Sequence, residues 1–208
     1  MNNRTEILSR LPRTASEIVG GRSHRRAYPD LPALFTQRLQ AVKGEVHRVQ
    51  NLNQGVEKLR EIFEQLKIEK VAANLEPPFD AAQLRETFPN QGWQFAGESA
   101  DFRRWCSEAD AGLTSAVFGL AETGSLVLVP GPTQSRLTSL LPPVHIVLLP
   151  ESRILPSIFD WVEKRPEAFP SNLVLVSGPS KTADIEQTLV VGVHGPKRLI
   201  VILFEDER

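Results

Sequence analysis

Four nearly uninterrupted apolar runs in the C-terminal half constrain the fold of this chain most. They are Leu126–Val129, His145–Leu149, Leu173–Val176 and Leu199–Leu203, and Leu, Val and Ile dominate all four. A strand with one exposed face alternates polar and apolar residues, whereas a continuous apolar run is typical of a strand that is covered on both faces. The runs therefore predict central strands of a sheet with layers on both sides.

Helices and strands alternate along the rest of the chain, which favours parallel strands joined by crossover helices. Asp80 is a suitable N-cap for one of these helices. We expect a three-layer α/β fold with a mostly parallel sheet flanked by helices, and with a helical N-terminal arm over 1–42 and an α/β domain over 43–208. The expected elements are helices over 31–42, 56–66, 81–88 and 154–162 and strands over 45–49 and 69–73.

Charge and cysteine content exclude several classes of protein. The 208 residues carry 24 basic and 25 acidic side chains, so no overall field favours nucleic acid. The single Cys106 excludes a disulfide within the chain and any zinc or iron–sulfur site made of several thiolates of one chain. We interpret it as an inert thiol, and the four histidines are scattered, so we expect no cofactor or metal bound by this chain alone.

We expect no segment that would direct this chain into a membrane. No apolar core follows the first residues, which argues against a signal peptide. No apolar stretch approaches the roughly 20 residues of a spanning helix. We therefore expect a cytoplasmic protein without membrane insertion.

The first of three loops that could carry chemistry precedes the apolar run at 126. Its candidate side chains are Glu122, Thr123 and Ser125, and Gly124 permits a close backbone approach. Glu122 is a candidate base, nucleophile or substrate anchor. The alternative is a turn whose hydroxyls satisfy backbone groups, and residue chemistry alone leaves both open.

The second loop offers an arginine and a histidine. Arg136 follows the segment 130–133 and could bind a carboxylate or phosphate through its planar fork, or simply pair with a nearby acid. His145 opens an apolar run, where a hydrogen-bonded core residue is the more common interpretation.

The third loop follows the run that ends at 176 and is the most informative. A helix beginning near Thr182 would leave free N–H groups at its start, and these with Gly178, Ser180 and Lys181 would form an anion cradle. The alternative is ordinary helix capping. His194, between two glycines, is a further binding candidate. We expect all three loops to meet at one edge of one sheet, since open α/β sheets gather ligands at their strand ends.

The same segments resemble the lactate-utilisation protein C family (LutC/YkgG, the LUD domain). The likeness covers about the last hundred residues. Its motifs are Asp-Ala-Gly-Leu-Thr at 110–114, Ala-Glu-Thr-Gly-Ser-Leu at 121–126, Ser-Leu-Leu-Pro-Pro-Val-His-Ile at 139–146, Ser-Gly-Pro-Ser-Lys-Thr-Ala-Asp-Ile-Glu at 177–186 and Gly-Val-His-Gly-Pro at 192–196.

This resemblance implies a fold similar to the NagB/RpiA/CoA-transferase group and a role in oxidising L-lactate to pyruvate. It also implies iron–sulfur subunits as partners, with this chain binding a small carboxylate or organising those subunits. The alternatives are a stand-alone enzyme of the CoA-transferase or cyclo-ligase kind, for which Glu122 resembles the catalytic glutamate in setting, and a structural adaptor. Whether the chain has turnover of its own stays open.

Overall fold

A parallel sheet organises the protein. The computed structural model describes residues 27–74, 81–163, 172–183, 189–191 and 195–206. Within these residues six strands pair in parallel in the order β1–β12–β7–β4–β2–β3. The expected mostly parallel α/β sheet is therefore confirmed. The strands are β1 (Glu45–Val49), β2 (Lys70–Asn74), β3 (Gly92–Phe95), β4 (Ala111–Ser115), β7 (Val144–Pro150) and β12 (Arg198–Phe204).

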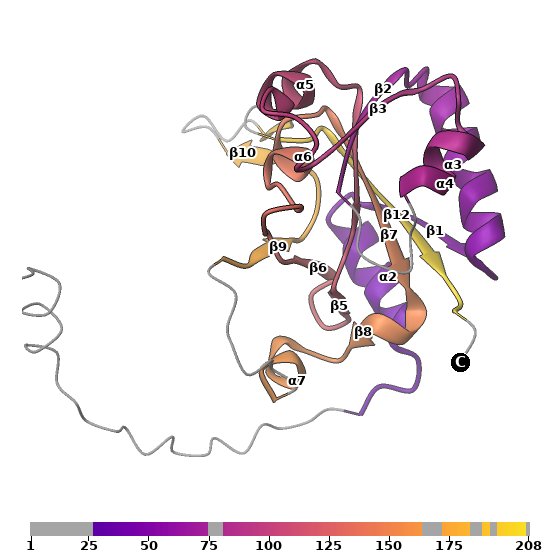
Figure 1. Cartoon of the computed structure of the whole chain (residues 1–208). Coiled ribbons are helices and arrows are strands. Elements are labelled where there is room, and N and C mark those ends of the chain that lie inside the picture. The colour runs from indigo at the N-terminus through magenta and orange to yellow at the C-terminus, as the bar shows by residue number, and fades with distance from the viewer. Residues whose placement is uncertain (1–26, 75–80, 164–171, 184–188, 192–194, 207–208) are drawn as a thin grey trace, which may run out of the picture.

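One face of the sheet is covered by α3 (Leu52–Leu66) and α4 (Ala81–Thr87), as Figure 1 shows. Asn51 begins α3 by accepting the Gln54 N–H through Oδ1 at 2.9 Å, and the expected apolar stripe of this helix faces the strands. Successive strand residues point to opposite faces, so Ile200 and Ile202 of β12 pack under α3, whereas Leu199 and Val201 do not.

The opposite face carries a second, smaller sheet together with short helices (Figure 1). Leu199 and Val201 pack there against this sheet and against α2. The order of the smaller sheet is β8–β5–β6–β9, and only the β5–β8 pair is parallel. The elements of this layer are α2 (Leu31–Ala41), α5 (Phe102–Glu108), α6 (Leu137–Leu140), α7 (Ile158–Glu163), β5 (Phe118–Leu120), β6 (Ser125–Leu128), β8 (Ile154–Leu155) and β9 (Val174–Val176).

Two of the four apolar runs were wrongly expected to be central parallel strands. The runs at 126–129 and 173–176 form β6 and β9, which pair with each other in the antiparallel direction in the smaller sheet. Ile154, expected in a helix, lies in β8, and α7 begins only at Ile158. The error has a simple cause: a continuous apolar run reports burial but not the strand with which it pairs.

The expected helix start near Thr182 is also wrong. Lys181–Ala183 is strand β10, which pairs with β11 (Leu189–Val191) as an antiparallel ladder. Without a helix there, no free helical N–H groups exist to form the expected anion cradle. Residues 184–188, which follow β10, lie outside the described residues.

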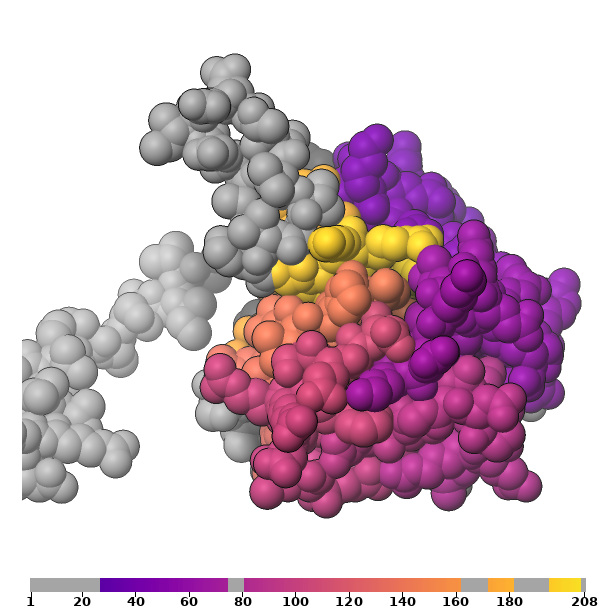
Figure 2. Space-filling model, turned by 90° about the horizontal axis from the view of Figure 1, so that it is seen from above, coloured from indigo at the N-terminus to yellow at the C-terminus, as the bar shows by residue number. Residues whose placement is uncertain are grey.

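The N-terminal arm is described only from residue 27, and α2 is the helix in this described part. Asp30 caps α2 by accepting the Ala33 N–H at 2.9 Å. Phe35 and Leu39 of α2 are fully buried against β7, β12 and the smaller sheet. The boundary between an arm and a domain at 42 remains a prediction. Seen from above, the yellow C-terminal residues lie between purple and orange parts of the chain, which agrees with the position of β12 between β1 and β7 (Figure 2).

Candidate functional site

A pocket of about 200 Å³ lies between α6, β9 and the amino ends of β7 and β12. Residues from both the second and the third loop reach it, and its polar side chains are hydroxyls and one imidazole. We call it the His145 pocket. Its lining residues are Ser139, Leu140, His145, Val174, Leu175, Val176, Ser177, Gly178, Ser180, Gly195, Pro196 and Leu199.

His145 is the polar residue most deeply set in this pocket. It is fully buried, and its Nε2 lies 2.9 Å from the hydroxyl oxygen of Thr114 on β4. Burial lowers the pKa of His145 to about 3, so the ring is neutral at pH 7. Its Nδ1 has no hydrogen-bond partner within the described part of the chain. The interpretation of His145 as a hydrogen-bonded core residue is confirmed, yet the residue also borders a cavity.

A glycine on β4 brings α6 down onto the sheet beside His145. Gly112 pairs with His145 in the β4–β7 register. A Cβ added at Gly112 would lie 1.8 Å from the carbonyl oxygen of Thr138, so no larger residue fits under α6. This close approach sets Ser139 at the pocket wall, where its hydroxyl donates to the Arg136 carbonyl oxygen at 3.0 Å.

A chain of hydroxyls links the first loop to the third. Ser125 Oγ donates to Thr123 Oγ1 at 2.7 Å and also lies 2.7 Å from Ser177 Oγ. Ser177 lines the pocket, whereas Ser125 supports it from β6. The first loop therefore contributes to the site through Ser125 and not through its carboxylate.

The carboxylate of Glu122 points elsewhere. It accepts a hydrogen bond from the hydroxyl of Tyr28 at 2.7 Å and does not line the pocket. Its neighbour Gly124 has a φ of 64°, and a Cβ there would lie 2.4 Å from the Leu39 N. The turn that carries Glu122 is thus pressed against α2.

The cationic candidates of the second and third loops are also outside the lining. Arg136 is exposed and directly precedes α6. The ammonium of Lys181 donates to the Val42 carbonyl oxygen at 2.7 Å, at the C-terminal end of α2, where a positive charge is favourable. Thr182 belongs to β10, and the candidate at 194 lies outside the described residues.

The three loops do not meet at one edge of one sheet, so that expectation is wrong. The first loop is the hairpin turn between β5 and β6 of the smaller sheet, the second leads into β7 of the large sheet, and the third joins β9 to β10. The second and third loops nevertheless meet at the His145 pocket. This pocket lies at the amino ends of β7 and β12, opposite to the carboxyl ends where α/β sheets usually bind ligands.

A much narrower space lies at the carboxyl ends of β2 and β4, where the strand order changes direction. Asn74 and Ser115 line it, and Asn74 Oδ1 is buried without a hydrogen-bond partner among the described residues. Its volume of about 10 Å³ is close to the smallest that holds one water molecule. It shares Ser139 and Val174 with the His145 pocket, so polar groups continue from one space to the other.

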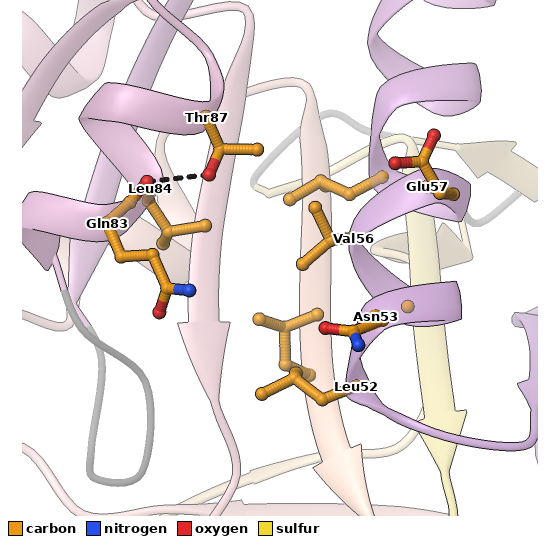
Figure 3. A pocket seen from close by; sticks show the side chains of 10 residues that line it. Leu52, Asn53, Val56, Glu57, Gln83, Leu84 and Thr87 are labelled. Atoms are coloured by element: carbon orange, nitrogen blue, oxygen red, sulfur yellow. Dashed lines mark hydrogen bonds between the residues drawn. The ribbon is translucent and has the colours of Figure 1, made fainter.

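A larger groove of about 240 Å³ runs between α3 and α4 on the opposite face of the sheet. Figure 3 shows Val56 and Leu84 facing each other across it, with Asn53, Glu57 and Thr87 around them. The Thr87 hydroxyl donates to the Gln83 carbonyl oxygen within α4. None of the sequence-predicted site residues lies there, which leaves the His145 pocket as the candidate site.

Neither metal chemistry nor a membrane span finds support in the described part of the chain. No group of three His, Cys, Asp or Glu side chains is arranged there to hold a metal ion. Cys106 is buried, and burial raises the pKa of its thiol to about 11, which agrees with an unreactive cysteine. No described helix is long and apolar enough to cross a bilayer.

Sequence reasoning missed Thr114, Ser139 and Ser177 as parts of the site. All three fall inside the motifs that carry the family resemblance, and this position in the motifs was the sequence signal that could have indicated them. The chemistry of a single threonine or serine gives no reason to select it, because its importance here depends on the partner that the fold supplies.

Comparison with known proteins gives consistent matches. A sequence model of the LUD domain matches residues 33–204. Lactate utilization protein C 1 of Bacillus mycoides is 31% identical over 193 residues, which cover 87% of this chain and 82% of that protein. Lactate utilization protein C of Halalkalibacterium halodurans is 42% identical over 105 residues, and an uncharacterized protein of Neisseria meningitidis serogroup B is 43% identical over 96 residues. These two matches span 46% and 41% of the relatives' own length.

The fold has a counterpart among solved structures. The crystal structure of a DUF162 family protein from Deinococcus radiodurans aligns with a TM-score of 0.59 and 21% sequence identity. The alignment covers 84% of this chain and 96% of that one. At this identity the likeness establishes the fold alone.

Proposed function

The chain belongs to the LUD domain family, and we propose that it serves the utilisation of L-lactate. The observation that carries this proposal is the similarity to a lactate utilization protein C along most of the chain. The His145 pocket adds physical support, since its volume and polar lining suit a ligand of a few heavy atoms.

In more detail, we propose a cytoplasmic component of a system that oxidises L-lactate to pyruvate with the help of iron–sulfur subunits. The single cysteine supports a division of labour in which those partners hold the clusters. Exposed leucines support contact with a partner, since Leu140 and Leu175 of the pocket lining are 43% and 49% exposed and the adjacent Leu141 is 42% exposed. Clustered apolar surface of this kind is typical of protein interfaces.

A structural adaptor without turnover is the second candidate, and the same leucines favour it. An enzyme of the CoA-transferase or cyclo-ligase kind has less support. Its expected catalytic residue Glu122 is held by Tyr28 and does not line the pocket.

Deletion of the gene for this chain in its native cells tests the proposal. We expect the deletion strain to lose growth on L-lactate and to grow normally on glucose, and we expect the wild-type chain to restore growth. Leu175→Ser tests whether the leucines are needed, with Phe159→Ser as a matched control, since Phe159 on α7 is exposed and does not line the pocket. Unchanged growth of the deletion strain on L-lactate would overturn the proposed role.

We also propose that this chain alone binds no cofactor. The purified protein should be colourless, with less than about 0.1 metal ion per chain, because one thiol and scattered histidines offer no ligand cluster. Elemental analysis that finds about one iron or zinc per chain would refute this part.

A further inference from the structure

We propose that the His145 pocket binds a small 2-hydroxy carboxylate, which His145 meets with an N–H donor and Ser139 and Ser177 meet with hydroxyl oxygens that accept the ligand's hydroxyl hydrogen. The inference rests on the proposed function for the identity of the acid. It adds the binding site and a reason to prefer the hydroxy acid to the oxo acid.

The position of the proton on His145 follows from its buried partner. If Nε2 held the proton and donated to Thr114, the Thr114 hydroxyl hydrogen and the Nδ1 lone pair would both lack a partner among the described residues. If Thr114 donates to Nε2, only the Nδ1–H lacks one. The second arrangement leaves fewer unsatisfied buried groups, so His145 carries its proton on Nδ1, where the N–H has no partner among the described residues.

The serine hydroxyls are acceptors for the complementary reason, since each has a single hydrogen. The hydrogen of Ser139 is used by the Arg136 carbonyl oxygen. The hydrogen of Ser125 is used by Thr123, so in the pair of Ser125 and Ser177 it is Ser177 that donates. Ser139 and Ser177 therefore present oxygen lone pairs to the pocket, and a ligand that binds there needs a hydrogen to donate.

The positively charged ammonium of Lys181 lies near the pocket but does not line it. The ammonium of Lys181 donates to the carbonyl oxygen of Val42, and the pocket residue Gly178 lies close to the same oxygen. The Lys181 ammonium lies 2.7 Å from this oxygen, and a Cβ built on Gly178 would lie 3.3 Å from it. A carboxylate in the pocket would feel this charge across a short distance at reduced dielectric.

The arrangement discriminates between the two oxidation states of the ligand. A 2-hydroxy acid supplies acceptors for the His145 N–H and a donor for the serine oxygens. A 2-oxo acid would place a carbonyl oxygen against those serine oxygens and leave them unpaired. Sites built to hydrogen-bond a hydroxyl reject analogues that lack its hydrogen by large factors, so we expect at least about a tenfold preference.

Titration calorimetry of the full chain with L-lactate, pyruvate and propionate tests this preference. L-Lactate should bind at least about tenfold more tightly than either of the other two. Pyruvate binding as tight as lactate would overturn the assignment of the serines as acceptors. Absence of binding by all three acids at millimolar concentration would overturn the site, whereas the proposed function would fail only if the deletion strain grew on L-lactate.

Two further measurements locate the ligand. Ser177→Ala should reduce the preference for lactate over pyruvate at least about fivefold without weakening pyruvate, while Ser107→Ala, an exposed serine on α5, should leave both affinities unchanged. Because Ser177 is exposed, its variant should fold normally. In nitrogen-resolved spectra of the histidine rings, L-lactate should shift the Nδ1 signal of His145. An unshifted Nδ1 signal at saturating lactate, or an unchanged preference in Ser177→Ala, would refute the placement.

Discussion

His145 Nε2 and Thr114 Oγ1 lie 2.9 Å apart on adjacent parallel strands, and both residues are fully buried. The contact joins β7 to β4 under α6 and fixes the imidazole that borders the pocket. Two motifs that are 31 residues apart in sequence therefore form one local unit.

Thr114→Val should destabilise the protein by about 1–3 kcal/mol, since it leaves a buried ring nitrogen without its partner while keeping the shape of the side chain. Urea unfolding at pH 7 measures the change. Thr87→Val removes a comparable hydroxyl from a more exposed position on α4 and should cost less than about 0.5 kcal/mol. Equal effects of both substitutions would contradict the importance of the buried pair.

Stability should fall as the pH is lowered from 7 to 5. Burial lowers the pKa of His145 in the folded state to about 3, against 6.5 as its ordinary value. Between these values the unfolded chain binds a proton that the folded chain does not bind, so acid favours unfolding. Integration of this difference gives about 2 kcal/mol lost between pH 7 and pH 5.

Urea unfolding at both pH values, for the wild type and for His145→Asn, isolates this contribution. The variant should lose less stability than the wild type over the same interval. His47 also has a lowered pKa because of burial and contributes equally to both proteins. A pH dependence that is identical in the two proteins would show that His145 is not buried in its neutral form.

Gly124→Ala should cost more than about 2 kcal/mol of stability. The residue has a φ of 64°, and an added Cβ would lie 2.4 Å from the Leu39 N of α2. Gly131→Ala is the matched control, since no heavy atom lies within 4 Å of a Cβ built there. Thermal unfolding of both variants compares them, and equal melting temperatures would disprove the close packing of this turn on α2.

Lys181→Met should weaken the binding of a small carboxylate by about three- to tenfold, because it removes the charge beside Gly178. Arg136→Met tests the other cation that the sequence predicts for anion binding, and we expect a smaller loss because Arg136 is exposed and does not line the pocket. Arg103→Met, an exposed arginine on α5, is the control. Calorimetry at low and high salt measures the affinities. If both variants bind the carboxylate as tightly as the wild type, neither cation contributes to binding.

The sequence predicted the helices and strands that local patterns specify. The apolar stripe of α3 and the β-branched runs of β7 and β12 stand where they were expected. These elements could be predicted because periodicity is a local property: the spacing of apolar residues along a helix indicates which of its faces is buried. The sequence also indicated part of the candidate site, because Gly178 and Ser180 lie in the third loop, which follows an apolar run, and both residues line the pocket.

By itself, therefore, the sequence determined that this chain forms a parallel α/β sheet with apolar strands covered on both faces, and which three loops carry polar residues beside them. Only the tertiary structure decided that β6 and β9 form a separate sheet, that Lys181–Ala183 is a strand, and that His145 pairs with Thr114 while Glu122 turns away to Tyr28. The reason is physical: strand propensity depends on the neighbours that a strand acquires, and hydrogen bonds between distant segments exist only after the chain has closed the loops between them.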